Sequence, residues 1–330
     1  MDYRLAENRR EYFDALYTMN LRHGVMPGLV YLYMPALSER FGWGAEQKLW
    51  FAFLNGMTQN PITSLRMLER LPECPPAGAE LTGFSDWFNR EWSTLQFDTD
   101  RRYQKADTVS AIKAYAKTVS EHGTQEAMLT GEYSALWELV RGHYYSFGRL
   151  SAFSYLEYVY LNGFGSDCDD LVFGDKSGSK SHRNGMFFLL GMDHLVWDKR
   201  QPGSHDGSYT DFKKMCAWLE RQAEDYLESV RDNPLLERYV SKFTLESNLC
   251  TFKNHFFGRR YPGVYADMAW ERIQWADERG QQPYTEVFKE VRQSLPAWLR
   301  AECEAKPLTL KQKAALFPET GSPYRGEHFL

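Results

Sequence analysis

The sequence lacks paired cysteines. Its cysteines form neither a C-x-x-C pair nor a cysteine–histidine spacing that suits zinc, and they lie far apart at Cys74, Cys168, Cys216, Cys250 and Cys303. An odd and scattered set of this kind is typical of reduced thiols. We therefore expect an intracellular protein that has no disulfide framework.

A long apolar run is also missing. No stretch approaches the ~18 uninterrupted apolar residues that mark a membrane helix. The N-terminus from Met1 to Arg4 carries charges where a signal peptide would be apolar. Both observations predict a soluble protein with no membrane partner.

The sequence has no excess of positive charge. Its formal net charge is −5 and its pI is about 6.0. A protein that binds nucleic acid mainly through its overall charge is basic, so any DNA contact has to come from a local basic groove. Aromatic residues, in contrast, are abundant, with 10 Trp, 20 Tyr and 21 Phe. They indicate a large aromatic core first and base stacking second.

Neither an alternating strand pattern nor an internal repeat is present, whereas helical periodicity recurs along the chain. We predict an all-α, multi-helix globular fold with long ordered loops. One domain is expected over 1–306, with a sub-boundary at the Pro/Gly-rich loop 72–83 and a C-terminal tail at 307–330. The expected helices cover 5–23, 45–54, 61–71, 84–95, 105–121, 132–162 with a break near Gly142 or Gly148, 208–230, 235–257, 264–279 and 284–304.

Common catalytic motifs are missing as well. There is no G-x-S-x-G, H-E-x-x-H or G-x-G-x-x-G, so hydrolase triads and Rossmann cofactors lose their usual support. Polar residues gather instead in four clusters, which we number in chain order. The first to fourth clusters are Asn55–Thr63, His143–Arg149, Lys180–Asn184 and Lys253–Tyr261.

The first cluster crowds amides and hydroxyls at a helix–helix corner, and we expect the preceding helix to stop at Asn55-Gly56. Turn and N-cap chemistry explains one or two of these side chains. Gln59, between Thr58 and Asn60, exceeds a capping requirement. Because side-chain amides present a donor beside an acceptor, recognition of a base edge is an equally good interpretation.

The second cluster places Arg149 within an aromatic helix. An arginine there needs a partner, which is either a carboxylate such as Glu157 or Asp170, or an anionic ligand. A histidine in such a setting, here His143, is more often a satisfied core residue than a catalytic one.

The third cluster combines small and basic residues at an expected helix N-terminus, which is a favourable place for a phosphate. The spacing does not match a Walker A motif, and a solvated basic loop is the alternative. Just upstream, Asp167, Asp169 and Asp170 suit either Mg²⁺ with a diphosphate or a charged turn. We favour the turn.

The fourth cluster follows a helix on which Glu246, Cys250 and Lys253 share one face. Arg259 and Arg260 come just after the helix end. Cations are expected there because of the helix dipole alone, and recognition of a carboxylate or a phosphate is equally consistent with the glycines around them.

In this order the clusters resemble the phage amino acid:DNA transferases, which act in the pathways that build hypermodified thymine. The resembling segments are LWFAFLNGMTQNPITS (49–64), HYYSFGRLSAFSYLEY (143–158), GSKSHRNGMFFLLGMD (178–193) and LCTFKNHFFGRRYPGVYADM (249–268). The resemblance implies that a kinase first diphosphorylates 5-hydroxymethyluracil in DNA. The transferase then displaces the diphosphate with the amino group of an amino acid.

With this reaction in view, each cluster receives a hypothetical role. Cations and small polar residues would hold the diphosphate: Arg149, Lys180, Ser181, Arg183 and Asn184. Basic and aromatic residues would hold the amino acid: Lys253, Arg259, Arg260 and Tyr261. The base would be read by Asn55, Thr58, Gln59 and Asn60. The attacking amine would lose its proton to His182, His143 or Asp170. In this hypothesis all four clusters line one pocket.

The resemblance implies two substrates, which are DNA containing modified uracil and a free amino acid. It also implies other enzymes of the modification pathway and the cytoplasm of an infected bacterial host. It implies no definite cofactor, and Mg²⁺ beside the diphosphate stays open. The alternatives are a helical glycosylase-like DNA-base enzyme and a non-enzymatic phage DNA-binding protein. Release of free base would favour the first, and scattered surface clusters would favour the second.

Overall fold

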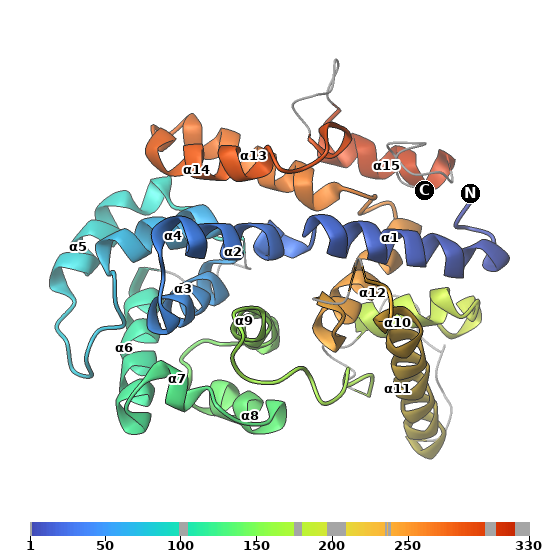
Figure 1. Ribbon diagram of the computed structural model, residues 1–330, viewed down its shortest axis with the longest axis horizontal. Coiled ribbons are helices and arrows are strands. Elements are labelled where there is room, and N and C mark those ends of the chain that lie inside the picture. Colours follow the sequence, from blue (N-terminus) through green and yellow to red (C-terminus); the bar gives the residue numbers. More distant parts are fainter. Residues whose placement is uncertain are drawn as a thin grey trace. The chain divides into compact units, whose positions relative to one another are not determined.

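A computed structural model describes residues 2–98, 105–174, 180–196, 209–234, 236, 239–300 and 308–320. Within these ranges all regular secondary structure is helical (Figure 1). The predicted all-α class is therefore confirmed. None of the helices in the described ranges has both the length and the apolar character needed to cross a membrane.

The chain folds as two compact units, and each consists of separate stretches of sequence. Unit 1 contains Met1–Leu29, Asp170–Trp270 and Leu295–Leu330, and unit 2 contains Val30–Asp169 and Glu271–Ser294. The Pro/Gly-rich loop at 72–83 lies inside unit 2. Since neither unit is continuous, this division does not test a domain prediction made along the sequence.

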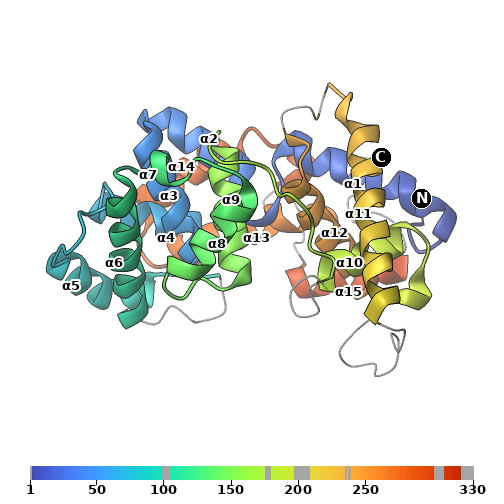
Figure 2. The same cartoon turned by 90° about the horizontal axis from the view of Figure 1, so that it is seen from below.

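In unit 1 the helices α10 and α12 lie side by side in both views (Figures 1 and 2). Gly185 permits this approach, because a Cβ at that position would lie 2.1 Å from the Leu249 carbonyl oxygen. The N-terminus of α12 is fixed by a capping box between Ser241 and Thr244. The helices of this unit are α1 (Arg9–His23), α10 (Lys180–Leu189), α11 (Tyr209–Arg231), α12 (Lys242–Phe256), the first half of α13 (Val264–Asp277) and α15 (Leu310–Thr320).

Unit 2 is built around α3 and α9, which pack closely at Gly56, where a Cβ would lie 3.0 Å from the Tyr155 Cβ. Phe53 of α3 stacks on Phe147 with ring centroids 5.4 Å apart. Its helices are α2 (Val30–Phe41), α3 (Ala45–Thr58), α4 (Pro61–Arg70), α5 (Thr82–Glu91), α6 (Lys105–His122), α7 (Gln125–Met128), α8 (Tyr133–His143), α9 (Arg149–Leu161), the second half of α13 and α14 (Gln282–Arg292). Short 3-10 helices in the two units cover Ala6–Asn8, Pro27–Leu29, Trp92–Thr94, Asp193–Leu195 and Ala297–Leu299.

Most expected helices are present, and the differences have local causes. The break expected near Gly142 or Gly148 is the connection between α8 and α9. The stop expected at Asn55-Gly56 was wrong, because α3 continues to Thr58 and ends only where Gln59 adopts a left-handed backbone with φ of 54°. Helix α2 was not expected, and it carries Pro35 in its interior.

Candidate active site

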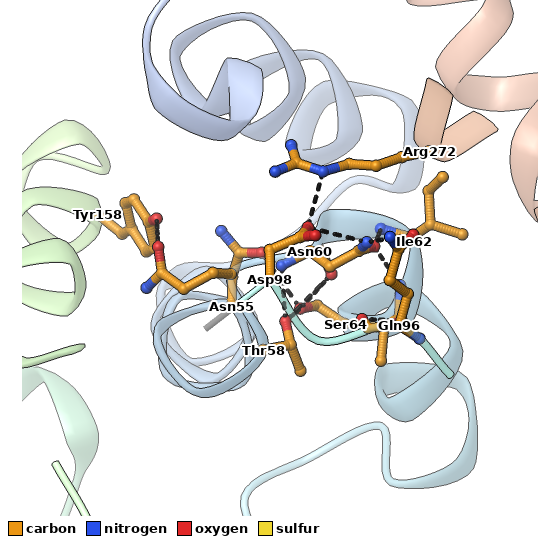
Figure 3. A network of polar contacts seen from close by, with 11 residues as sticks. Asn55, Thr58, Asn60, Ile62, Ser64, Gln96, Asp98, Tyr158 and Arg272 are labelled. Atoms are coloured by element: carbon orange, nitrogen blue, oxygen red, sulfur yellow. Dashed lines mark hydrogen bonds and ion pairs between the residues drawn. The ribbon is translucent and has the colours of Figure 1, made fainter. Parts of the chain in front are cut away.

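The first cluster forms the α3–α4 corner of unit 2 (Figure 3). Asn60 is the N-cap of α4, and its side-chain oxygen accepts hydrogen bonds from the backbone N–H groups of Ile62 and Thr63, both at 3.1 Å. The hydroxyls of Thr58 and Ser64 lie 2.6 Å apart. These side chains are buried, and the capping interpretation accounts for their contacts.

The carboxylate of Asp98, whose side chain is 18% exposed, extends this corner to other segments of unit 2. Asp98 accepts a hydrogen bond from Asn60 Nδ2 at 3.1 Å and an ion pair from Arg272 Nε at 2.7 Å (Figure 3). Its backbone N–H donates to the Thr58 carbonyl at 2.9 Å. Burial raises the pKa of Asp98, while Arg272 and the bond from Asn60 oppose that rise. The network therefore joins α3, α4, the segment before residue 98 and α13.

Two amides of the first cluster differ from the rest. Asn55 is fully buried; its oxygen accepts from Ser64 at 3.2 Å, while its Nδ2 has no hydrogen-bond partner among the described residues. Gln59 is half-buried, donates to the Gly56 carbonyl and accepts from the Tyr158 hydroxyl at 3.1 Å. Base recognition by Asn55, Thr58, Gln59 and Asn60 stays a prediction.

The second cluster is the connection between α8 and α9, also in unit 2. His143 is exposed in the last turn of α8, and Arg149 is half-buried as the first residue of α9. Glu157, one of the carboxylates considered for Arg149, is buried and accepts a hydrogen bond from the Tyr31 hydroxyl at 3.0 Å. The roles of His143 and Arg149 stay predictions.

The aspartates upstream of the third cluster behave as turn residues. Each carboxylate accepts a backbone N–H: Asp167 from Cys168 at 2.8 Å, Asp169 from Ser134 at 3.0 Å, and Asp170 from Val172 at 2.9 Å. Across the described residues no group of His, Cys, Asp or Glu side chains is arranged to hold a metal. The local contacts of Asp167 and Asp170 fit the turn interpretation, whereas Asp169 accepts from the first turn of α8. Proton transfer by Asp170 stays a prediction.

The third cluster forms the first turn of α10 in unit 1, and most of its described side chains are buried. His182 Nε2 lies 2.7 Å from the Leu171 carbonyl oxygen, and Arg183 donates to the Phe173 carbonyl at 2.8 Å. Glu220 of α11 accepts the Leu171 N–H at 3.1 Å. His182 and Arg183 therefore hold the segment 171–173 against the start of α10. Asn184 is also buried and Ser181 is half-buried, while the side chain of Lys180 lies outside the described part of the chain.

His182 also reaches α12. Its Nδ1 lies 2.9 Å from a carboxylate oxygen of Glu246, so both ring nitrogens face an oxygen. A carbonyl oxygen only accepts, so Nε2 carries a proton. Since the imidazole is fully buried and the Glu246 side chain is 14% exposed, Glu246 is the member of the pair that solvent reaches.

The fourth cluster meets the third along one face of α12. We call Glu246, Cys250, Lys253 and Phe257 the α12 stripe. The first three share one face of α12, and Phe257 is the C-cap residue directly after the helix, four positions beyond Lys253. Lys253 Nζ donates to the Ser181 hydroxyl at 3.5 Å. Burial, with a smaller contribution from Glu246 and against the effect of Lys253, raises the pKa of Cys250 to about 11, so the thiol is neutral near pH 7.

After the stripe, the two arginines Arg259 and Arg260 reach solvent, whereas Tyr261 is buried. Arg259 is exposed and Arg260 is half-buried. Tyr261 is fully buried, and its hydroxyl donates to Asp267 at 2.7 Å. Lys313 of α15 donates to the same carboxylate oxygen at 2.8 Å. This arrangement gives Tyr261 a structural contact, and amino-acid binding by Tyr261 stays a prediction.

The structure thus brings the third and fourth clusters together in unit 1, and places the first and second in unit 2. Glu246, Cys250 and Phe257 were not among the predicted site residues. Their spacing along α12 is the signal that could have identified them. The contact between Ser181 and Lys253 joins positions 72 residues apart and depends on helix packing. One pocket lined by all four clusters stays a prediction.

Comparisons with known proteins identify the family of the chain. Residues 33–261 match the amino acid:DNA transferase family. A serinyltransferase of Salmonella phage ViI is 27% identical over 296 residues, covering 84% of this chain and 71% of that protein. No solved structure matches the chain. The match covers well over half of the sequence and includes all four clusters. The chain belongs to the amino acid:DNA transferase family and is an enzyme that transfers an amino acid onto phage DNA in thymidine hypermodification.

Proposed function

We propose that the amino group of a free amino acid displaces diphosphate from 5-(diphosphoryloxymethyl)uracil in DNA. The amino group loses a proton and attacks the methylene carbon. A C–N bond forms while the C–O bond to diphosphate breaks, and the diphosphate leaves with the electron pair. The secondary amine that results loses its remaining extra proton. The reaction therefore needs cations for the leaving group and an acceptor for the proton.

The α12 stripe and its neighbour Ser181 offer both kinds of group within unit 1. Lys253 is buried to 7% exposure and contacts Ser181, so it is a positioned cation rather than a solvated one. Glu246 is an acceptor that reaches solvent. His182, whose Nδ1 lies 2.9 Å from the Glu246 carboxylate, acts through Glu246 as a positioning residue. The meeting of α10 with α12 through the pairs Ser181–Lys253 and His182–Glu246 is the single observation that carries this proposal.

We assign Glu246 to the amino group of the incoming amino acid and Lys253 to the anion that faces it, whether carboxylate or diphosphate. Arg259 and Arg260 add positive charge at the end of the same helix. Arg183 donates to the Phe173 carbonyl and is fully buried, so it contributes to the site mainly by positioning the segment 171–173.

Serine is the first nucleophile to test, because the relative from Salmonella phage ViI is a serinyltransferase. We further place the enzyme in the cytoplasm of an infected bacterial host, with the kinase that supplies diphosphorylated DNA acting before it. Mg²⁺ would accompany the diphosphate as a substrate ion, which makes a dependence on chelator a simple additional measurement.

The test is mass spectrometry of nucleosides after incubation of the enzyme with diphosphorylated 5-hydroxymethyluracil DNA and a mixture of amino acids. The expected result is a new nucleoside with one amino acid attached through nitrogen, together with release of one diphosphate. DNA containing 5-hydroxymethyluracil without the diphosphate is the matched control and should give no adduct. No adduct with any amino acid, or release of free base instead, would contradict the proposal.

A further inference from the structure

Phe257 closes the α12 stripe and is unusual among the aromatic residues of unit 1. Its side chain is 38% exposed. The other large apolar side chains that are exposed in the described part of this unit are aliphatic: Leu5, Val172, Leu308 and Leu316. A benzene ring that the core does not cover has room for another flat ring.

The core of unit 1 does not account for this ring. The preceding Phe256 stacks on Phe188 with ring centroids 3.9 Å apart and planes at 2°. Phe257 meets Phe188 only edge-on, at 6.1 Å. The apolar packing at the end of α12 therefore uses Phe256, and Phe257 extends past it towards solvent.

Two cations lie over the ring of Phe257. Lys253 Nζ is 5.3 Å from the ring centroid, and Arg259 Cζ is 5.9 Å away. Both distances lie within the range of a cation–π contact. Arg259 is exposed, so a base that stacks on the ring would take its place there while the guanidinium turns to a phosphate. An aromatic ring accompanied by positive charges complements a nucleotide, in which a flat base is joined to a sugar that carries the backbone phosphates.

We propose that Phe257 is a stacking platform for a base of the substrate DNA, with Arg259 contacting the adjoining backbone phosphate. The proposal rests on the function proposed above. Because Lys253 contacts both the Phe257 ring and Ser181, a base on the ring would lie beside the cation proposed to meet the substrate anion. Stacking would thus bring the 5-substituent towards Lys253, in a protein whose net charge does not favour DNA.

The experiment compares Phe257→Ala and Phe257→Trp with Leu316→Ala, a control that removes an exposed apolar side chain from α15 of the same unit. Affinity for a diphosphorylated oligonucleotide is measured by fluorescence anisotropy at several salt concentrations. The Michaelis constants for DNA and for the amino acid are measured separately. We expect Phe257→Ala to weaken DNA binding roughly 5- to 100-fold, which is the range of one stacked base. The Michaelis constant for the amino acid should not change.

Phe257→Trp should bind DNA at least as well as the wild type, and Leu316→Ala should be unaltered. Arg259→Ala should weaken binding to all sequences and reduce the salt slope by about 1, as the loss of one phosphate contact does. Wild-type DNA affinity in Phe257→Ala, or an equal loss in the folded Phe257→Trp variant, would overturn the platform. Absence of any adduct from the wild-type enzyme would contradict the proposed function instead, and the binding measurements would still decide the role of Phe257.

Discussion

The α3–α4 corner of unit 2 and the α12 stripe of unit 1 each bring polar side chains together, but these side chains are used differently. At the corner, Asn60 and Thr58 satisfy backbone groups and one another, and Asp98 has two partners. Along the stripe, Lys253 has a long contact to a hydroxyl, and Glu246 remains partly exposed. A corner stabilised by its own contacts has few free donors, whereas the stripe holds charges that a substrate can meet.

The largest expected effect tests the stripe directly. Lys253→Met should lower kcat/KM roughly 100- to 1000-fold, because one positioned donor to a developing anion is worth about that much. Stability should change little, since methionine replaces a buried charge by an apolar chain of similar length. Enzyme kinetics with diphosphorylated DNA measures the first quantity, and urea denaturation measures the second.

Lys242→Met is the matched control for this variant. Lys242 is the first residue of the same helix, and its ammonium pairs with Glu224 of α11 at 3.2 Å. Turnover should stay within about a factor of two, as expected for a surface ion pair. Full activity in Lys253→Met would show that the stripe is not the anion site.

The second effect tests the packing that assembles the stripe. Gly185→Ala should lower the free energy of unfolding by about 3 kcal/mol, because its new Cβ would meet the Leu249 backbone at 2.1 Å and α10 would have to move. Displacement of α10 also separates Ser181 from Lys253, so activity should fall in the protein that remains folded. Urea denaturation and initial rates measure the two losses.

Gly142→Ala in α8 provides the control for added bulk at a helical glycine. No atom lies within 4 Å of its Cβ position. Alanine there should stabilise the helix by up to about 1 kcal/mol, since it has the higher helix propensity. An equal response of both variants would refute the close-approach argument.

The third effect concerns the opposite side of α12, where His255 is fully buried and its Nδ1 lies 3.2 Å from the Tyr12 hydroxyl. Burial, with a smaller effect of Arg260, lowers the pKa of His255 from 6.5 to about 3. Below pH 6.5 the imidazole of His255 therefore binds a proton in the unfolded chain, whereas it stays neutral in the folded chain until the pH approaches 3. This contribution to stability is complete above pH 6.5 and is lost as the pH falls towards 3.

Between pH 7 and pH 5 the loss should amount to about 2 kcal/mol. Urea denaturation of the wild type and of His255→Gln at both pH values isolates this contribution, because glutamine keeps a polar side chain that does not titrate. The wild type should lose more stability than the variant. Equal losses would show that His255 is not the group responsible.

The smallest effect tests the corner. Asn60→Ala should cost about 1 kcal/mol of stability through the loss of the N-cap, and Asn60→Ser should recover most of it. Turnover per folded molecule should stay near the wild-type value in both variants. If Asn60→Ser kept its stability but lost most of its turnover per folded molecule, Asn60 would instead be placed at the substrate. The contrast between the two regions would then disappear.

Local patterns were enough to predict most of the fold. The periodicity of α6, α9 and α11 and the glycine-rich break before Arg149 are properties of neighbouring residues. The end of α3 was misplaced because burial of Asn55 and Gly56 against α9 outweighs their low helix propensity. Helix α2 escaped prediction because its interior Pro35 normally signals a break.

The same reasoning separates what could be predicted of the site from what could not. Glu246, Cys250 and Lys253 belong to one helix, so their common face follows from spacing alone. Their meeting with Ser181 and His182 depends on the contact of α10 with α12, which no local pattern contains. Burial of Arg183 against the Phe173 carbonyl is also a tertiary property, and its sequence resembled that of an exposed anion site.

The interleaved course of the chain has a consequence for how such genes diversify. The polypeptide leaves one unit for the other after residues 29, 169, 270 and 294. A single exchange of DNA between two related genes replaces one continuous stretch. The shortest stretch that encodes all of unit 2, residues 30–294, also carries residues 170–270 of unit 1, and only the whole chain encodes unit 1. One exchange therefore cannot replace one unit and leave the other unchanged, so neither unit can be acquired as a separate module in a single step.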